Sequence, residues 1–230
     1  MSIMSVRLPQ LRVLVTDYCN SRCVYCRPSG EGNLGSRHMD MKYVTAINVA
    51  RAYSSCGGSC MKITGGDPVF WPHSVEFVHA LKGELAFEHV ELITRSPAIS
   101  KIIGSLADSS LDVLNFSLDT LSPIRYHEIT GRNDFDEYIS TITRSALLVS
   151  CKINMVILQD TSVDEVTDMM TFCMDCGIRE LKLLDYIEDL NEGCKFCKGS
   201  QSSVFQSIYK KLDALSSNRT RVFQGDFGHP

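Results

Sequence analysis

The sequence predicts an α/β fold built on a parallel sheet of six strands. Three observations support this prediction. Six short apolar runs, typical of strands buried on both faces, recur along the chain, and segments of helical periodicity separate them. A loop with glycine or polar residues follows each run. The length of 230 residues suits one α/β domain, either an open doubly wound sheet or an incomplete barrel.

The strands are expected where apolar and β-branched residues are nearly continuous. They are residues 11–15, 60–63, 90–93, 113–116, 153–158 and 181–184. Because a crossover separates each strand from the next, neighbouring strands are expected to be parallel, with right-handed connections.

The helices are expected where apolar residues recur three or four positions apart. They are residues 44–52, 74–82, 138–149, 163–176 and 204–215. Val44 and Ile47 share a face of the first helix, and Val75 and Val78 share a face of the second. The fourth helix ends before Gly177, a residue type favoured just past a helix C-terminus.

Composition excludes several classes of protein. The chain has 23 basic and 27 acidic residues and a net charge of −4, which argues against a protein that holds nucleic acid through a basic surface. The first ten residues lack the apolar run of a secretory signal. No segment has the roughly 18 uninterrupted apolar residues of a membrane helix. We therefore expect a cytoplasmic protein with no membrane and no nucleic-acid partner.

The ten cysteines are the compositional feature that most needs an explanation. They fall below the roughly 8–10% of residues typical of a disulfide scaffold, so clustered thiols indicate metal or redox ligands. Cys19, Cys23 and Cys26 follow the first strand in C-x3-C-x2-C spacing. Three thiolates on one loop can hold three irons of a cubane cluster and leave the fourth iron open, as in a catalytic metal site.

Polar residues also follow the other strands, at the edge where parallel α/β proteins place their active sites. Gly65, Gly66, Asp67 and Pro68 follow the second strand. Two glycines allow a ligand to approach the backbone closely, and the carboxylate offers acceptors to a cationic amine. An amine and a carboxylate bound beside an open iron describe the methionine end of S-adenosylmethionine.

The cysteine motif, with Tyr25 before its last cysteine, resembles the signature of the radical S-adenosylmethionine superfamily. Residues 65–68 resemble the Gly-Gly-Glu-Pro motif of that superfamily. Segments 11–17, 115–119, 129–132 and 152–154 are similar to those of the GTP 3′,8-cyclases of molybdenum-cofactor synthesis. The resemblance implies a partial (βα)6 TIM-like barrel with parallel strands. We expect one domain over residues 1–230, with a core over about 10–215 and a short C-terminal tail.

The resemblance also implies an oxygen-sensitive enzyme with a [4Fe–4S] cluster on Cys19, Cys23 and Cys26. Its open iron would bind S-adenosylmethionine, and an external electron donor such as flavodoxin or ferredoxin would drive cleavage to methionine and a 5′-deoxyadenosyl radical. That radical would abstract a hydrogen from a small, nucleotide-like substrate, in biosynthesis by carbon–carbon bond formation or cyclisation. The implied cofactor contacts are Tyr25, Gly65, Gly66, Asp67, Pro68, Thr94, Ser117 and Asn154.

Two basic residues are candidate substrate contacts, and two other positions differ from the pattern of the cyclases. Arg12 and Lys62 fall where the cyclases use basic residues for the triphosphate, and alternatively they only neutralise nearby carboxylates. Tyr18 stands where the cyclases commonly have arginine, and Arg95 lies in a Thr-Arg-Ser segment in place of the familiar Thr-Asn-Gly.

Two other functions compete with this interpretation. Cys194 and Cys197 would supply an auxiliary metal site in a peptide-modifying or dehydrogenating radical enzyme. In a zinc-binding regulatory module without catalysis, His38 would complete a zinc site with the three loop cysteines.

The remaining cysteines are expected to be packed thiols. Cys173 and Cys176 end a helix at the amino edge of the sheet, too far from Cys194 and Cys197 to share a metal with them. Buried positions are also expected for Cys56, Cys60 and Cys151.

Overall fold

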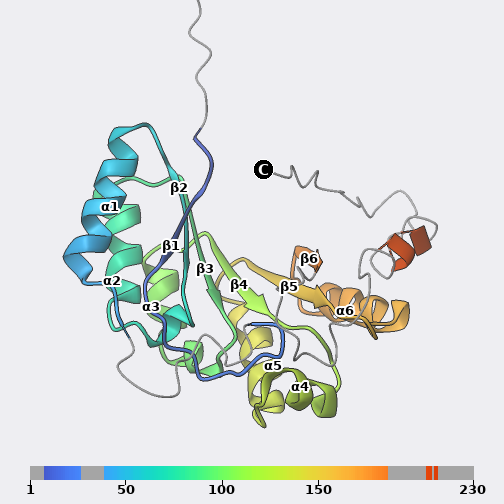
Figure 1. The fold of residues 1–230 in the computed structure, drawn as a ribbon. Coiled ribbons are helices and arrows are strands. Elements are labelled where there is room, and N and C mark those ends of the chain that lie inside the picture. Colours follow the sequence, from blue (N-terminus) through green and yellow to red (C-terminus); the bar gives the residue numbers. More distant parts are fainter. Residues whose placement is uncertain (1–7, 27–38, 186–205, 209, 212–230) are drawn as a thin grey trace, which may run out of the picture.

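A computed structural model describes residues 8–26, 39–185, 206–208 and 210–211. Its centre is one sheet of six parallel strands, ordered β1-β2-β3-β4-β5-β6 as in the sequence (Figure 1). The strands are β1 Leu11–Leu14, β2 Cys60–Thr64, β3 His89–Thr94, β4 Val113–Ser117, β5 Cys151–Ile157 and β6 Glu180–Asp185. In the described residues β1 and β6 do not pair with each other, so the barrel that the sheet forms is incomplete. The predicted (βα)6 architecture is confirmed.

Helices connect the strands and lie along the outer side of the sheet (Figure 1). The α-helices are α1 Tyr43–Ser55, α2 Ser74–His79, α3 Ile103–Asp108, α4 Pro123–Thr130, α5 Phe135–Ser145 and α6 Val163–Asp175. Shorter turns are η1 Pro68–Phe70, η2 Ala80–Glu84 and η3 Pro97–Lys101. No helix of the described ranges is long and apolar enough to cross a bilayer.

All six strand predictions are confirmed to within two residues at each end. The helix predictions are confirmed for α1, α2, α5 and α6, and Gly177 has the expected left-handed backbone with a φ of 69°. Of the predicted helix at 204–215, residues 206–208 and 210–211 are described, and they are helical.

The sequence analysis missed α3 and α4 because both are short. The ends of α4 nevertheless carry clear signals. Ser122 caps its first turn by accepting a hydrogen bond from the Arg125 backbone N–H, and Pro123 occupies its first position. Gly131 ends it with a φ of 68°.

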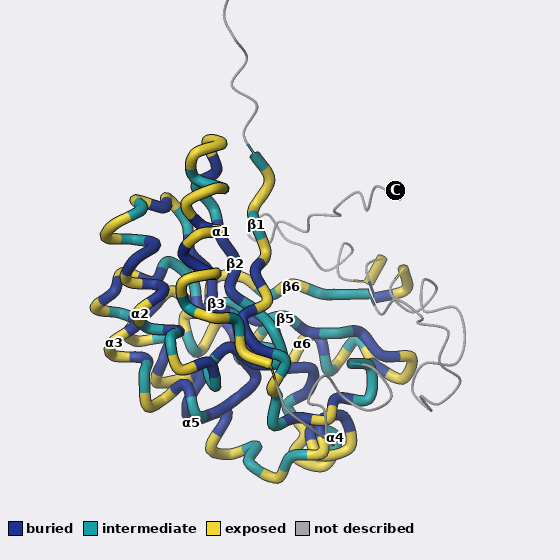
Figure 2. The backbone as a smooth tube through the Cα atoms, turned by 60° about the vertical axis from the view of Figure 1, so that its left-hand side comes forward, coloured by how far each residue is buried: buried dark blue, intermediate teal, exposed yellow. Residues whose placement is uncertain are grey.

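Alternation along the strands separates an apolar outer face from a polar inner face. Outward-facing Val13, Met61, Leu92, Phe116 and Ile153 are buried against the helices. Figure 2 shows the central strands as largely buried, whereas β1 and β6 carry more exposed segments. The open edges of the barrel are therefore its least buried strands.

The inner face carries a buried network of charge. Glu91 on β3 lies between two lysines, 3.0 Å from Lys62 Nζ and 2.9 Å from Lys152 Nζ. Its Oε1 also accepts a hydrogen bond from Asn115 Nδ2 at 2.6 Å. Burial alone would raise the pKa of Glu91, but these hydrogen bonds and the two positive charges outweigh it and lower that pKa. Lys62 thus has a carboxylate partner, the alternative role considered for it.

The prediction that the cysteines outside the loop are buried is confirmed for some of them and wrong for Cys56. Cys151 and Cys173 are buried as expected, and Cys176 is partly buried, with its Sγ 3.6 Å from Thr143 Oγ1. The prediction of a buried Cys56 is wrong, because the residue ends α1 on an exposed turn. Cys60, which opens β2, is partly buried.

We predict that Glu91→Gln lowers the free energy of unfolding by about 3–5 kcal/mol. The change removes the one negative charge between two buried lysines, which then repel each other. Urea unfolding followed by circular dichroism measures it. Glu180→Gln is the matched control, because Glu180 is 58% exposed and lies 3.8 Å from Lys152, so about 0–1 kcal/mol is expected. Equal effects of the two changes would contradict a structural role for the network.

Candidate active site

The candidate site lies at the carboxyl edge of the sheet, where residues 16–26 form what we call the cysteine loop. The loop leaves the end of β1 and passes beneath the neighbouring strands toward α4 (Figure 1). At its start Thr16 pairs with Asp40 through an isolated bridge and a side-chain hydrogen bond of 2.6 Å. Asp17 Oδ1 accepts a hydrogen bond from the Met39 N–H at 2.7 Å.

The first anchor of the cysteine loop is the turn that follows β2. The N–H groups of Gly66 and Asp67 donate to the carbonyl oxygens of Thr16 and Tyr18, both at 2.7 Å. A Cβ at Gly65 would lie 2.3 Å from the Thr16 oxygen, and one at Gly66 would lie 2.3 Å from the Tyr18 oxygen. The two glycines therefore allow one backbone segment to contact another, whereas the sequence analysis had assigned that space to a ligand.

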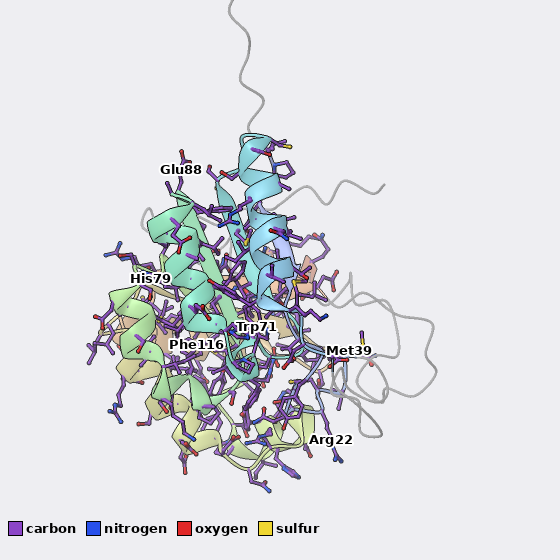
Figure 3. The ribbon with its side chains drawn as sticks, turned by 90° about the vertical axis from the view of Figure 1, so that its left-hand side faces the viewer. Arg22, Met39, Trp71, His79, Glu88 and Phe116 are labelled. Atoms are coloured by element: carbon purple, nitrogen blue, oxygen red, sulfur yellow. The ribbon has the colours of Figure 1, made fainter. Side chains whose placement is uncertain are left out.

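The second anchor is the C-terminal end of α4. The N–H of Arg22 donates to the Thr130 carbonyl at 2.8 Å, and the N–H of Val24 donates to the Ile129 carbonyl at 2.9 Å. The last carbonyls of a helix have no partner inside it, so here the cysteine loop supplies their donors. The Arg22 side chain extends outward from the loop, away from the buried Phe116 (Figure 3).

The third anchor is a buried polar cluster formed by Tyr25, Arg95 and Asp119. The Tyr25 hydroxyl donates to Asp119 Oδ2 at 2.7 Å, and Arg95 Nη2 donates to the same oxygen at 2.7 Å. Arg95 Nη2 also contacts the Tyr25 hydroxyl. Asp119 Oδ1 accepts from the Val156 N–H at 2.9 Å, which ties the cluster to β5. These four contacts join the cysteine loop to β3, β4 and β5.

Asp67 is buried among hydrogen-bond donors of this chain. Its carboxylate accepts from Thr94 Oγ1 at 2.8 Å, from the Arg95 N–H at 2.9 Å and from the Val69 N–H at 3.2 Å. Burial raises the pKa of Asp67 to about 6, although these hydrogen bonds act against the shift. The carboxylate thus holds the loops after β2 and β3 together, while its expected contact with a cofactor amine stays a prediction.

The other predicted cofactor contacts lie at the same edge. Pro68 is buried and begins η1, and Thr94 is buried against Asp67. Ser117, the last residue of β4, is paired with Asn154 in the middle of β5. Asn154 Oδ1 is buried without a hydrogen-bond partner among the described residues, so it has an unused acceptor. Arg12, by contrast, lies on the exposed edge strand β1.

The three cysteines of the cysteine loop differ in burial. Cys23 is buried, and Cys19 and Cys26 are partly buried. In the described ranges no three His, Cys, Asp or Glu side chains gather closely enough to hold one metal ion. In a cubane cluster each of the three thiolates would bind a different iron. Burial raises the pKa of Cys19 to about 12 and also raises that of Cys23, so ligation would have to displace their protons.

Several predicted residues fall outside the described ranges. These are Cys194 and Cys197, proposed for an auxiliary site, and His38, proposed for a zinc site. Conversely, Arg95 and α4 belong to the site although neither was predicted from the sequence. The only sequence signal for Arg95 was that it interrupts the Thr-Asn-Gly pattern.

Six parallel strands with a three-cysteine loop at their carboxyl edge define the class of radical enzymes built on incomplete barrels. A comparison with protein families agrees, because the model of the Radical SAM superfamily matches residues 13–173. The chain belongs to the Radical SAM superfamily, whose enzymes use a [4Fe–4S] cluster and S-adenosylmethionine.

Relatives of this chain include several GTP 3′,8-cyclases. That of Vibrio vulnificus (strain YJ016) is 31% identical over 159 residues, which cover 68% of this chain and 48% of the cyclase. That of Clostridium perfringens (strain 13 / Type A) is 28% identical over 216 residues, covering 94% of this chain and 66% of the cyclase. The chain therefore spans about half the length of the Vibrio cyclase.

Solved structures share the fold at low sequence identity. SuiB of Streptococcus suis, bound to S-adenosylmethionine, matches 90% of this chain and 47% of its own with a TM-score of 0.72 and 18% identity. Methylornithine synthase matches 88% of this chain and 62% of its own with a TM-score of 0.65 and 10% identity. These likenesses confirm the incomplete barrel.

We predict that Gly66→Ala lowers the free energy of unfolding by about 1–3 kcal/mol or more, because its Cβ would overlap the Tyr18 carbonyl. Chemical denaturation of the iron-free chain measures the change. Gly104→Ala in α3 is the control, since nothing lies within 4 Å of the added carbon. There the free energy of unfolding should rise by up to about 1 kcal/mol. A neutral Gly66→Ala would contradict the proposed anchoring of the loop.

We also predict that Asp67→Asn reduces the fall in the free energy of unfolding between about pH 4 and about pH 6. The folded pKa of Asp67 is about 6 against an ordinary 3.8, so this group lowers stability as pH rises from about 4 to about 6. Urea unfolding of the wild type and the variant at pH 4, 5, 6 and 7 isolates that contribution. Asp108→Asn, at an exposed carboxylate of α3, should leave the slope unchanged. A slope equal in wild type and Asp67→Asn would refute the burial argument.

Proposed function

We propose that this chain is the catalytic barrel of a radical S-adenosylmethionine enzyme with its [4Fe–4S] cluster on Cys19, Cys23 and Cys26. One observation carries the proposal: a loop with three cysteines is held at the carboxyl edge of a six-stranded parallel barrel by the turn of residues 65–68. Such a cluster supplies one electron that cleaves S-adenosylmethionine to methionine and a 5′-deoxyadenosyl radical, which abstracts a hydrogen from the substrate.

The residues of the chain have distinct tasks in this proposal. The cysteines bind iron, while the glycine turn and the end of α4 fix the loop that carries them. Asn154, with its unused buried acceptor, and its neighbour Ser117 offer polar contacts to the bound cofactor. Tyr25 contributes its ring and backbone, because its hydroxyl is already bound to Asp119.

We propose an anionic small molecule, such as a nucleotide, as the substrate. On the inner face Arg12, Lys62 and Lys152 outnumber the carboxylates of Glu91 and Glu180, so the excess charge there is positive. The GTP 3′,8-cyclases among the relatives support this substrate class. The reaction would then be a biosynthetic cyclisation or carbon–carbon bond formation, with an external donor such as flavodoxin or ferredoxin supplying the electron.

Anaerobic reconstitution tests the cluster. We expect a brown protein with about four irons and four sulfides per chain that cleaves S-adenosylmethionine to 5′-deoxyadenosine in the presence of dithionite. Cys23→Ala should lose both the iron and the cleavage. Cys56→Ala should keep both, because Cys56 is exposed at the end of α1. A colourless protein with zinc in place of iron would refute the proposal and favour the regulatory module.

The same preparation tests the substrate and the alternative enzyme. With GTP and other nucleotides, coupled turnover should consume the nucleotide in step with 5′-deoxyadenosine. If only uncoupled 5′-deoxyadenosine forms with every nucleotide, the nucleotide proposal fails. Clearly more than four irons per chain, lowered in Cys194→Ala, would favour the peptide-modifying or dehydrogenating enzyme with an auxiliary site at Cys194 and Cys197.

A further inference from the structure

Arg95 anchors the cysteine loop, but neither the fold nor the proposed chemistry explains why a buried charge stands at this position. Its side chain is 8% exposed and lies at the end of β3, directly behind the cysteine loop. It forms a buried ion pair with Asp119, whose side chain is 1% exposed. A buried pair is expensive to desolvate and is weak evidence for stability, so its position calls for another explanation.

The geometry of the pair is asymmetric with respect to the cysteine loop. Arg95 Nη2 contacts both Asp119 Oδ2 and the Tyr25 hydroxyl, and the guanidinium carbon lies 5.8 Å from the centre of the Tyr25 ring. Asp119 Oδ1 points the other way, to the Val156 N–H on β5. Both members of the pair contact the Tyr25 hydroxyl, and the guanidinium of Arg95 also lies over the Tyr25 ring, in the segment between Cys23 and Cys26.

A further observation concerns the far side of the guanidinium. Arg95 Nη1 is buried without an acceptor among the described residues. Arg95 therefore has an unused donor at this end of the sheet, in the part of the chain that the structure describes.

We infer that Arg95 is a positioning residue for the iron–sulfur cluster: it holds Tyr25 and Asp119 in place and directs a buried positive charge toward the cysteine loop, which makes one-electron reduction of the cluster easier. The inference rests on the proposed cluster at Cys19, Cys23 and Cys26. Reduction takes one electron from an external donor and adds one negative charge at the cluster. A nearby cation in a site of low dielectric stabilises the more negative state and raises the reduction potential.

Charge and geometry can be separated with four variants of the full chain. Arg95→Gln removes the charge, Arg95→Lys keeps it with a different shape, Asp119→Asn removes the opposing charge, and Tyr25→Phe removes only the hydroxyl. Arg51→Gln is the matched control, because Arg51 is exposed on α1. The first readout is the midpoint potential of the reconstituted cluster, measured by redox titration with electron paramagnetic resonance.

The expected potential shifts have opposite signs. Arg95→Gln should lower the midpoint potential, Asp119→Asn should raise it, and Arg95→Lys and Arg51→Gln should leave it close to that of the wild type. A role in packing alone would not produce shifts of opposite sign. The inference is overturned if Arg95→Gln and Asp119→Asn shift the potential in the same direction, or if neither shifts it. If Arg95→Gln does not fold, a potential in Asp119→Asn that is unchanged or lower also overturns it.

The second readout needs no iron. In the iron-free chain, Tyr25→Phe and Arg95→Gln should speed hydrogen exchange at the amides of residues 22–26, and Arg51→Gln should not. Unchanged exchange in both variants would overturn the clamping role. A wild-type chain that takes up no iron would refute the proposed function, and exchange in the iron-free chain would still decide whether Arg95 holds the loop. If the cluster forms normally but its midpoint potential is the same in the wild type and in Arg95→Gln, the inference about Arg95 is refuted and the proposed function is not.

Discussion

The backbone junction between residues 16–18 and residues 65–67 fixes the position of the candidate site. Two hydrogen bonds of 2.7 Å join these segments, and they form only because positions 65 and 66 have no Cβ. Once the segments are joined, the cysteine loop must leave β1 across the carboxyl edge of the sheet. The remaining anchors at α4 and at the Tyr25–Arg95–Asp119 cluster then hold its far end. The three cysteines thus lie on a loop fixed at both ends.

Polar residues inside the barrel are arranged in two layers. The deeper layer is the network of Lys62, Glu91 and Lys152, in which one carboxylate lies between two lysines. The upper layer lies at the strand ends, where Asp67 and Asp119 accept backbone and side-chain donors from neighbouring loops. Every carboxylate named here has several donors, as buried carboxylates require. Among the described residues, unused buried polar atoms occur in both layers, at Asn115 beside Glu91 and at Arg95 after β3.

Sequence patterns predicted the architecture well, because its cause is local. Strands buried on both faces must be short and apolar, and each βα unit repeats that pattern, so six strands could be found from residue type alone. The short helices α3 and α4 were missed, whereas α2, also of six residues, was found because its helical pattern continues through η2. Cys56 was misjudged because burial depends on where a helix ends relative to the sheet, which residue type does not report.

The sequence by itself determined the class of fold, the three-cysteine loop and the turn of residues 65–68, because each depends on residues close together in the chain. Tertiary structure decided what these residues contact. In the folded chain the two glycines contact the backbone of the cysteine loop, Asp67 accepts hydrogen bonds from donors of the chain, and Lys62 pairs with Glu91. It also brought Arg95 to Tyr25, 70 positions away in the sequence. Contacts between distant residues follow from the closing of the barrel, and spacing along the chain does not encode them.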